Sequence, residues 1–191
     1  NIQFLSEAVS IEQAIKDSKR ENSLEKVLYT PNRTRFLDDV NRPQYHLIEP
    51  EKWMNEPHAP FFFNGYYHIF YQANLHAPIW DSIQWGHLAS KDMVHWQDLP
   101  LALQSEKGFY DELGCWSGSG LVDKDGVPRI YYTAGNSNRF PNQAVALAQP
   151  EDTEEDPLLK KWKKYPSLIK EQDIGWLGEF RDPFVWIEND S

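Results

Sequence analysis

Short apolar runs separated by turn-forming residues dominate the chain from Tyr45 onward. Runs of this length, rich in aromatic and β-branched residues, are typical of β-strands. The pattern predicts strands over residues 61–63, 66–72, 83–89, 96–99, 117–122, 129–134, 143–148, 161–165 and 184–187. Because no helical pattern lies between them, these strands predict an all-β domain over residues 45–191.

Two turn sequences and an internal repeat sharpen this prediction. Asn64-Gly65 is a strong signal for a two-residue β-hairpin. Residues 123–126 (Asp-Lys-Asp-Gly) faintly resemble a calcium-binding loop, but the distal acid is absent at the required offset, so a second hairpin is the better interpretation. Residues 65–71 and 127–133 resemble each other at an offset of 62 residues, which favours a propeller over the sandwich or barrel that the strands alone also allow.

Residues 1–44 show a different, helical pattern. Ser10 and Gln13 form a capping box before an amphipathic helix over residues 11–19, and Asn22 with Glu25 predicts the cap of a second short helix. We therefore expect a helical arm or linker that carries no chemistry.

Charge and cysteine content exclude several classes of function. The net charge of −10 would repel phosphate groups, so neither nucleic acid nor an anionic membrane is an expected partner. No apolar run approaches the roughly 18 residues of a membrane-spanning helix. Cys115 is the only cysteine, which excludes an intrachain disulfide and predicts a buried thiol. The 6 histidines lack the spacing of metal ligands, so we expect no metal or other cofactor.

The sequence leaves the cellular location open. No signal-peptide pattern begins the chain, and a single cysteine suits a cytoplasmic protein as well as a secreted enzyme without disulfides.

Candidate chemistry lies in two carboxylates that directly precede prolines. Glu56 lies in the sequence Trp-Met-Asn-Glu-Pro, and Asp182 lies in Arg-Asp-Pro. Proline restricts the residue before it to extended geometry, so both acids are predicted to lie in rigid loops, although such pairs also end ordinary strands. Glycoside hydrolysis uses two carboxyl groups, and aromatic rings such as those of the 8 tryptophans stack on sugars. The pattern therefore favours a sugar-cleaving site.

Seven motifs extend this hypothesis: Trp53-Met54-Asn55-Glu56-Pro57, Phe70-Tyr71-Gln72, Trp80, Trp85-Gly86-His87, Val94-His95-Trp96, Trp116-Ser117-Gly118-Ser119 and Arg181-Asp182-Pro183. In this order they resemble glycoside hydrolase family 32, which includes invertases, sucrose-6-phosphate hydrolases, inulinases, levanases and fructosyltransferases. The resemblance implies a five-bladed β-propeller with a funnel-shaped site on its axis. The 147 residues from 45 to 191 would cover about the first three blades.

The resemblance also implies residue roles. Glu56 corresponds to the nucleophile that attacks a β-linked fructosyl unit, and Asp182 to the stabiliser of the transition state, kept ionised by the neighbouring Arg181. Substrate-binding positions are Trp53, Met54, Asn55, Gln72, Trp80, Trp116, Ser117 and Arg181. Structural positions that pack the blades together are Trp85, His87, His95 and Trp96.

Two features depart from the family pattern. Glu56 stands where the family usually has Asp, and His58-Ala59 replaces Asn-Gly beyond the proline. The acid/base of the family is a Glu in a Glu-Cys motif beyond Arg-Asp-Pro, and the chain stops at Ser191 before such a motif. We therefore expect the chain to be the front part of a longer protein and to hold two of three catalytic carboxylates.

Three functional hypotheses follow. The first is a retaining β-fructofuranosidase or fructosyltransferase acting on sucrose or a fructan. The second is an arabinanase-like glycosidase on the same fold, and the third is a sugar-binding relative without catalysis. The sequence leaves open the particular fructoside, the choice between hydrolysis and transfer, and the oligomeric state.

Overall fold

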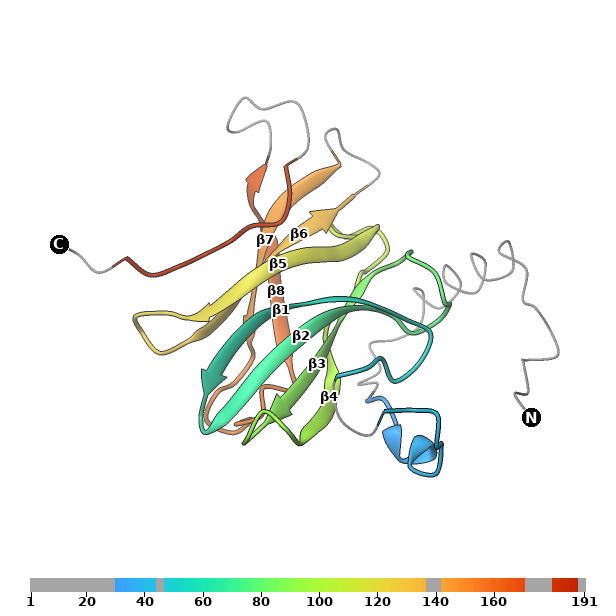
Figure 1. Cartoon of the computed structure of the whole chain (residues 1–191). Coiled ribbons are helices and arrows are strands. Elements are labelled where there is room, and N and C mark those ends of the chain that lie inside the picture. The colour runs from blue at the N-terminus through green and yellow to red at the C-terminus, as the bar shows by residue number, and fades with distance from the viewer. Residues whose placement is uncertain (1–29, 44–46, 137–141, 171–179, 189–191) are drawn as a thin grey trace.

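A computed structural model describes residues 30–43, 47–136, 142–170 and 180–188. These residues contain two four-stranded antiparallel sheets (Figure 1). The first sheet consists of β1 (Trp53–Phe63), β2 (Tyr66–Asn74), β3 (Gln84–Ser90) and β4 (Trp96–Leu103). The second consists of β5 (Gly114–Val122), β6 (Pro128–Gly135), β7 (Gln143–Pro150) and β8 (Trp162–Lys170). In each sheet every strand pairs with the next one along the chain.

The sequence repeat corresponds to one sheet. β2 and β6, which contain most of the two similar segments, are each the second strand of their sheet. The all-β prediction is thus confirmed. The described residues form two four-stranded sheets, and the offset of 62 residues between the repeats is longer than the roughly 40–50 residues of a typical propeller repeat.

Both predicted hairpins are present. Asn64 and Gly65 have φ of 48° and 80°, and two positive values are what a type I′ turn requires. In the second hairpin, the Asp123 carboxylate accepts the amides of Asp125 and Val127 at 2.9 Å and also pairs with Arg129. The carboxylate is therefore used by the turn itself.

Two predictions about elements were wrong, and a third lies outside the described residues. β1 begins at Trp53 and not near residue 61, so Glu56 lies within a strand and not in a loop. Residues 184–187 form no strand, because no neighbouring strand among the described residues pairs with them; Phe184 and Trp186 are 76% and 65% exposed. A 3-10 helix spans Arg33–Phe36, whereas the helices predicted near residues 11–28 lie outside the described residues.

The two sheets share one apolar core. It gathers Phe70, Trp85 and Leu103 from the first sheet with Ile130, Tyr132 and Trp162 from the second. Cys115 is buried in the same core, as predicted, and burial raises the pKa of its thiol. The indole Nε1 of Trp85 donates to the carbonyl of Trp116 at 3.1 Å, so a hydrogen bond also joins the sheets.

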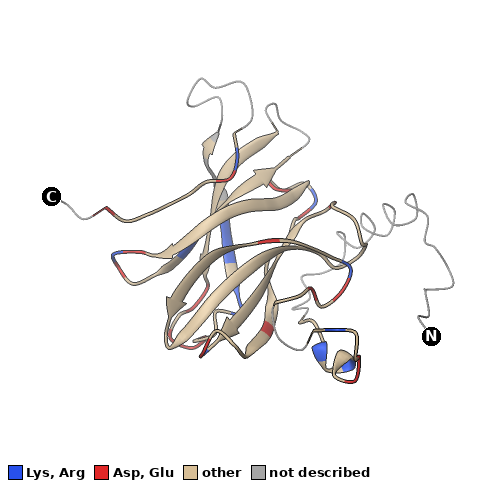
Figure 2. Ribbon diagram, viewed as in Figure 1, with Lys and Arg blue, Asp and Glu red and all other residues tan. Residues whose placement is uncertain are grey.

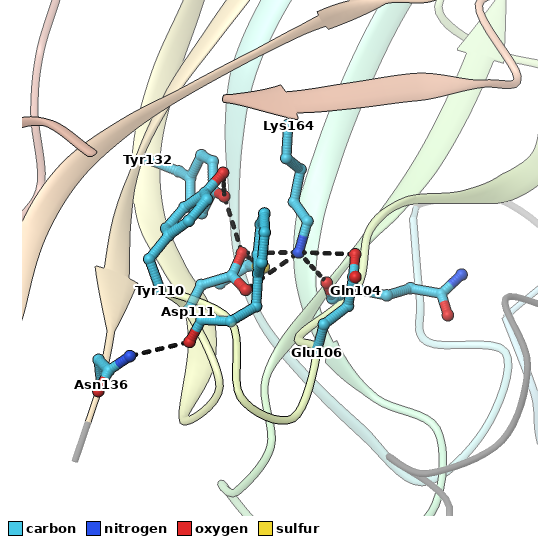
Figure 3. Close-up of polar contacts among 9 residues, drawn as sticks. Gln104, Glu106, Tyr110, Asp111, Tyr132, Asn136 and Lys164 are labelled. Carbon is cyan, nitrogen blue, oxygen red and sulfur yellow. Dashed lines mark hydrogen bonds and ion pairs between the residues drawn. The ribbon is translucent and has the colours of Figure 1, made fainter. Parts of the chain in front are cut away.

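A buried polar network holds the connection between the sheets (Figure 3). Asp111 lies in the loop between β4 and β5, and its carboxylate accepts from Lys164 Nζ at 2.8 and 3.0 Å and from the Tyr132 hydroxyl at 2.8 Å. Lys164 also donates to the Gln104 carbonyl at 2.6 Å and lies 3.2 Å from Glu106. Buried charges persist only when they are paired, so this network fixes the loop that leads into β5.

Candidate active site

Most of the predicted site residues come from three segments, β1, β5 and residues 180–188, while Gln72 comes from β2 and Trp80 from the loop between β2 and β3. β1 and β5 run beside each other where the two sheets meet, and residues 180–188 cross the second sheet (Figure 1). Acidic and basic residues concentrate in loops and turns, while most strand positions carry neither (Figure 2). Glu56 is the one charged residue of β1, and it is exposed.

A chain of hydrogen bonds reaches Glu56 from the interior of the first sheet. Asn55 Nδ2 donates to Gln72 Oε1 at 3.4 Å, and Gln72 Nε2 donates to Ser117 Oγ. The Ser117 hydroxyl in turn donates to Glu56 Oε1. Gln72 is buried, so the exposed Glu56 carboxylate accepts a hydrogen bond from a serine whose hydroxyl is itself fixed by a buried amide. Four of the predicted site residues are therefore directly connected.

Irregularities in the strands direct these side chains. Ser117 lies between the register pairs Trp116–Thr133 and Gly118–Tyr132, so it is one residue more than β6 can pair. Glu56 lies in a similar register shift of β1, between Met54 and Pro57. A bulge bends a strand and re-aims a side chain, which explains how side chains of β1 and β5 meet across the sheet boundary.

An aromatic pair stands beside this chain. Trp116 occupies a slot between Gly114 and Gly135, since a Cβ atom on either glycine would lie 2.6 Å from the indole. The Trp80 ring, 50% exposed, lies 5.8 Å from the ring of Trp116, measured between centroids. Such a surface can stack on the C–H face of a sugar.

Trp53 and Met54 are placed differently from the other predicted substrate-binding residues. Trp53 is partly buried, and Met54 packs against the apolar cluster of Tyr71, Ala73 and Leu88. Met54 therefore supports β1 from the core.

Asp182 is held by a hydrogen bond from its backbone amide and not by its side chain. Its φ of 59° is left-handed, and its amide donates to the Thr133 hydroxyl at 2.7 Å. Arg181 Nε lies 3.6 Å from Asp182 Oδ2, but both side chains are largely exposed, so the attraction between them is weak. The arrangement leaves the Asp182 carboxylate open to a ligand.

His58 sets the electrostatic surroundings of Glu56. The centroid of its ring lies 3.9 Å from that of Trp85, with 36° between the two ring planes. Burial lowers the pKa of His58 to about 4, and the negative charge of Glu56 only partly opposes this shift. At neutral pH, Glu56 therefore has a neutral imidazole behind it and not a cation.

Among the residues assigned to packing, one was wrong. Trp85 and His87 are buried, and Trp96 packs against the core of the first sheet. The side chain of His95 is instead 87% exposed and lies in the loop after β3, with Nδ1 2.7 Å from Asp92 Oδ2. The motif Val94-His95-Trp96 had led to the prediction that His95 packs as a strand residue. Strand β4 begins only at Trp96, so His95 precedes the strand and is not packed by it.

Within the described ranges, no three His, Cys, Asp or Glu side chains are grouped as metal ligands. In that same part of the chain, no helix is long and apolar enough to cross a bilayer.

Comparison with known proteins identifies the family. Residues 46–191 match the profile of the glycosyl hydrolases family 32 N-terminal domain. The chain belongs to glycosyl hydrolase family 32. Structures of this family are β-propellers, and the two four-stranded sheets fit part of one.

Similar proteins are named for fructoside chemistry. An acid beta-fructofuranosidase of Vicia faba is 43% identical over 154 residues, which are 78% of this chain and 23% of that protein. The vacuolar acid beta-fructofuranosidase 4 of Arabidopsis thaliana is 42% identical over 74% of this chain and 21% of its own length. The structure of fructan 1-exohydrolase IIa from Cichorium intybus matches with a TM-score of 0.64 at 32% identity, covering 83% of this chain and 27% of that one. The chain thus spans about a quarter of the length of these relatives.

Proposed function

We propose that this chain forms the fructosyl-binding side of the active site of a retaining β-fructofuranosidase acting on sucrose or fructans. The observation that carries the proposal is the exposed Glu56 carboxylate, held at one oxygen by Ser117 and backed by the buried Gln72. Membership of the family supports it, as do the relatives named as acid beta-fructofuranosidases and a variant of the Cichorium intybus exohydrolase in complex with 1-kestose.

In this mechanism Glu56 is the nucleophile. The hydrogen bond from Ser117 occupies Oε1, which leaves the second oxygen to attack the anomeric carbon of the fructosyl unit. The bond to the leaving oxygen breaks, that oxygen takes up a proton, and a fructosyl ester forms on Glu56. Water then gives up a proton to the group that had protonated the leaving oxygen and attacks the same carbon, the bond to Glu56 breaks, and fructose departs from the regenerated carboxylate. We assign the proton donor to none of the described residues.

Asp182 and the aromatic pair act on the sugar itself. Asp182 accepts hydrogen bonds from the fructosyl hydroxyls, and these bonds tighten as the ring flattens toward the oxocarbenium ion, which lowers the barrier. Trp80 and Trp116 offer a stacking surface beside the nucleophile.

A fructoside with a good leaving group tests Glu56 as the nucleophile, because its cleavage does not need a proton donor. In p-nitrophenyl β-D-fructofuranoside the nitrophenolate leaves without protonation, so the fructosyl ester forms and accumulates when its hydrolysis is slow. We expect mass spectrometry to find one fructosyl unit on the peptide that contains Glu56 and none in the Glu56→Gln variant. Glu51→Gln, which removes a surface carboxylate paired with Arg35, is the matched control and keeps the label. A label that persists in Glu56→Gln contradicts the nucleophile assignment.

Turnover tests the substrate class in the protein at its natural length. We expect release of fructose from sucrose or 1-kestose, and a loss in kcat of more than about a thousandfold in Glu56→Gln. Release of arabinose from arabinan would instead favour the arabinanase-like alternative, and fructan binding without turnover would favour a non-catalytic relative.

A further inference from the structure

Side chains, and not a neighbouring strand, hold the segment that carries Asp182. Gln143 Oε1 accepts the amide of Phe180 at 2.9 Å, Thr133 Oγ1 accepts that of Asp182 at 2.7 Å and Ser119 Oγ accepts that of Val185 at 3.0 Å. We call Ser119, Thr133 and Gln143 the clasp. They lie on β5, β6 and β7, and the segment runs across the second sheet in Figure 1.

Thr133 differs from the rest of the clasp because its hydroxyl bonds to both halves of the candidate site. It accepts from the Asp182 amide and donates to the Ser117 carbonyl at 3.0 Å. The side chain of Ser117 in turn contacts Glu56. One buried hydroxyl therefore lies on the shortest described path of hydrogen bonds between the two candidate carboxylates.

A simpler explanation is that a buried threonine merely satisfies its own hydroxyl. The Ser117 carbonyl alone would do so, and threonine commonly bonds to a nearby carbonyl. The second bond goes to a residue 49 positions away whose backbone is left-handed at φ 59°. This conformation is uncommon for a non-glycine residue, although aspartate adopts it more readily than most, and contacts with the surroundings help to keep it. The Thr133 hydroxyl thus bonds to the backbone amide of the residue that adopts this conformation.

We propose that Thr133 is a positioning residue that sets the Asp182 carboxylate relative to Glu56. The proposal rests on the function proposed above. The Asp182 side chain is largely exposed, so its location depends on where the backbone is fixed. Loss of the Thr133 hydroxyl frees the Asp182 amide and lets the carboxylate drift from the fructosyl ring.

Thr133→Val tests the proposal, because valine keeps the shape of threonine and removes both hydrogen bonds. In the protein at its natural length we expect kcat on sucrose to fall by about a hundredfold, as for a misplacement of about 1 Å, with KM nearly unchanged. Hydrogen exchange, followed by mass spectrometry, should accelerate in peptides that cover residues 180–188. Thr133→Ser restores the hydroxyl and should restore most of kcat and of the protection from exchange.

Tyr132→Phe is the matched control. It removes a buried hydroxyl from the neighbouring position of β6, where the partners are Asp111 and Tyr110 and neither is a residue of the site. We expect lower stability with kcat and the exchange of residues 180–188 little changed. The proposal is overturned if Thr133→Val keeps the wild-type kcat, or if Thr133→Ser loses as much as Thr133→Val.

The exchange measurement separates this proposal from the proposed function. Faster exchange in Thr133→Val, in a protein that never cleaves fructosides, would confirm the clasp and reject the fructosidase. If Thr133→Val does not fold, Ser119→Ala tests the same clasp, since it removes the acceptor of the Val185 amide and should accelerate exchange there. Unchanged exchange in that variant would overturn the clasp.

Discussion

At Ser117, one hydroxyl accepts a hydrogen bond from Gln72 and donates one to Glu56. The order of donors follows from the chemistry of each group. An ionised carboxylate can only accept, so the serine must donate to Glu56 and take its own hydrogen bond from the Gln72 amide. Asn55 then donates to the oxygen of that amide. An exposed carboxylate is thereby fixed by groups that have little freedom to rotate.

Ser117→Ala should weaken catalysis without removing the nucleophile. A hydrogen bond to a charged group contributes about 1.5–3 kcal/mol, so its loss predicts a fall in kcat of roughly tenfold to a hundredfold. Steady-state kinetics of the natural-length protein on sucrose measures the effect. Ser105→Ala is the control, because Ser105 is buried and its hydroxyl has no hydrogen-bond partner in the described part of the chain. An equal loss in both variants would contradict the role given to Ser117.

Motif spacing predicted the residues that act on a ligand better than those that support them. Glu56, Gln72 and Ser117 lie in motifs, and the structure connects them. Thr133 was missed, because a threonine in a strand has no local signal that distinguishes a hydrogen-bonding role from β propensity. Its partner Asp182 lies 49 positions away, and only the fold brings the two together.

Glycines flank the candidate site residues Trp116 and Ser117 in strand β5, because a larger side chain at these positions would collide with its neighbours. A Cβ atom on Gly118 would lie 2.0 Å from the Tyr131 carbonyl oxygen, so the bulge at Ser117 requires glycine at the next position. Gly114 and Gly135 leave room for the Trp116 ring in the same way. The motif that contains Trp116 and Ser117 therefore encodes backbone packing as well as ligand contacts.

Gly118→Ala should destabilise the protein by at least about 3 kcal/mol, because a rigid carbonyl occupies the place of the new methyl group. Gly126→Ala is the comparison. A Cβ atom there meets nothing within 4 Å, and only the positive φ of 77° opposes it, for about 1–2 kcal/mol. Urea unfolding of both variants measures the difference. A loss in Gly118→Ala no larger than in Gly126→Ala would show that the bulge can relax.

The turn sequences predicted the hairpins correctly, whereas the proline after Glu56 led to a wrong prediction of a loop. Asn64-Gly65 and residues 123–126 formed the expected hairpins. Pro57 suggested a loop at Glu56, yet it lies inside β1 next to a register shift, and Pro60 lies within a second shift of the same strand. Proline is tolerated where a strand is irregular, since the ladder there is already interrupted. For residues 184–187 a strand was predicted and none is present. An apolar run forms a strand only where another strand lies beside it.

At the scale of the whole molecule, three histidines that are buried among the described residues oppose folding in acid. His58, His68 and His87 lie in the first sheet, and His68 Nδ1 is 2.9 Å from His87 Nε2. Burial lowers the pKa of His58 and of His68 to about 4 each and lowers that of His87 as well. Such groups stay neutral in the folded state and bind protons more readily once the chain unfolds.

Stability should therefore fall as the pH falls from about 6.5 toward about 4. In this window the unfolded chain binds more protons than the folded one, so the free energy of unfolding rises with pH. For His58 alone the pKa change from 6.5 to about 4 corresponds to about 3 kcal/mol across the window. Equilibrium urea unfolding at a series of pH values measures this slope.

His58→Phe isolates the contribution of one ring. Phenylalanine can retain the contact with the Trp85 ring, and neither ring nitrogen of His58 has a hydrogen-bond partner among the described residues. We expect the variant to unfold at a higher urea concentration than the wild type near pH 4.5 and to show a shallower dependence on pH. His95→Gln, which replaces an exposed histidine, should keep the wild-type slope. If His58→Phe and the wild type lost stability in parallel as the pH fell, the proton uptake would have to lie at other groups, and the neutral imidazole behind Glu56 would lose its support.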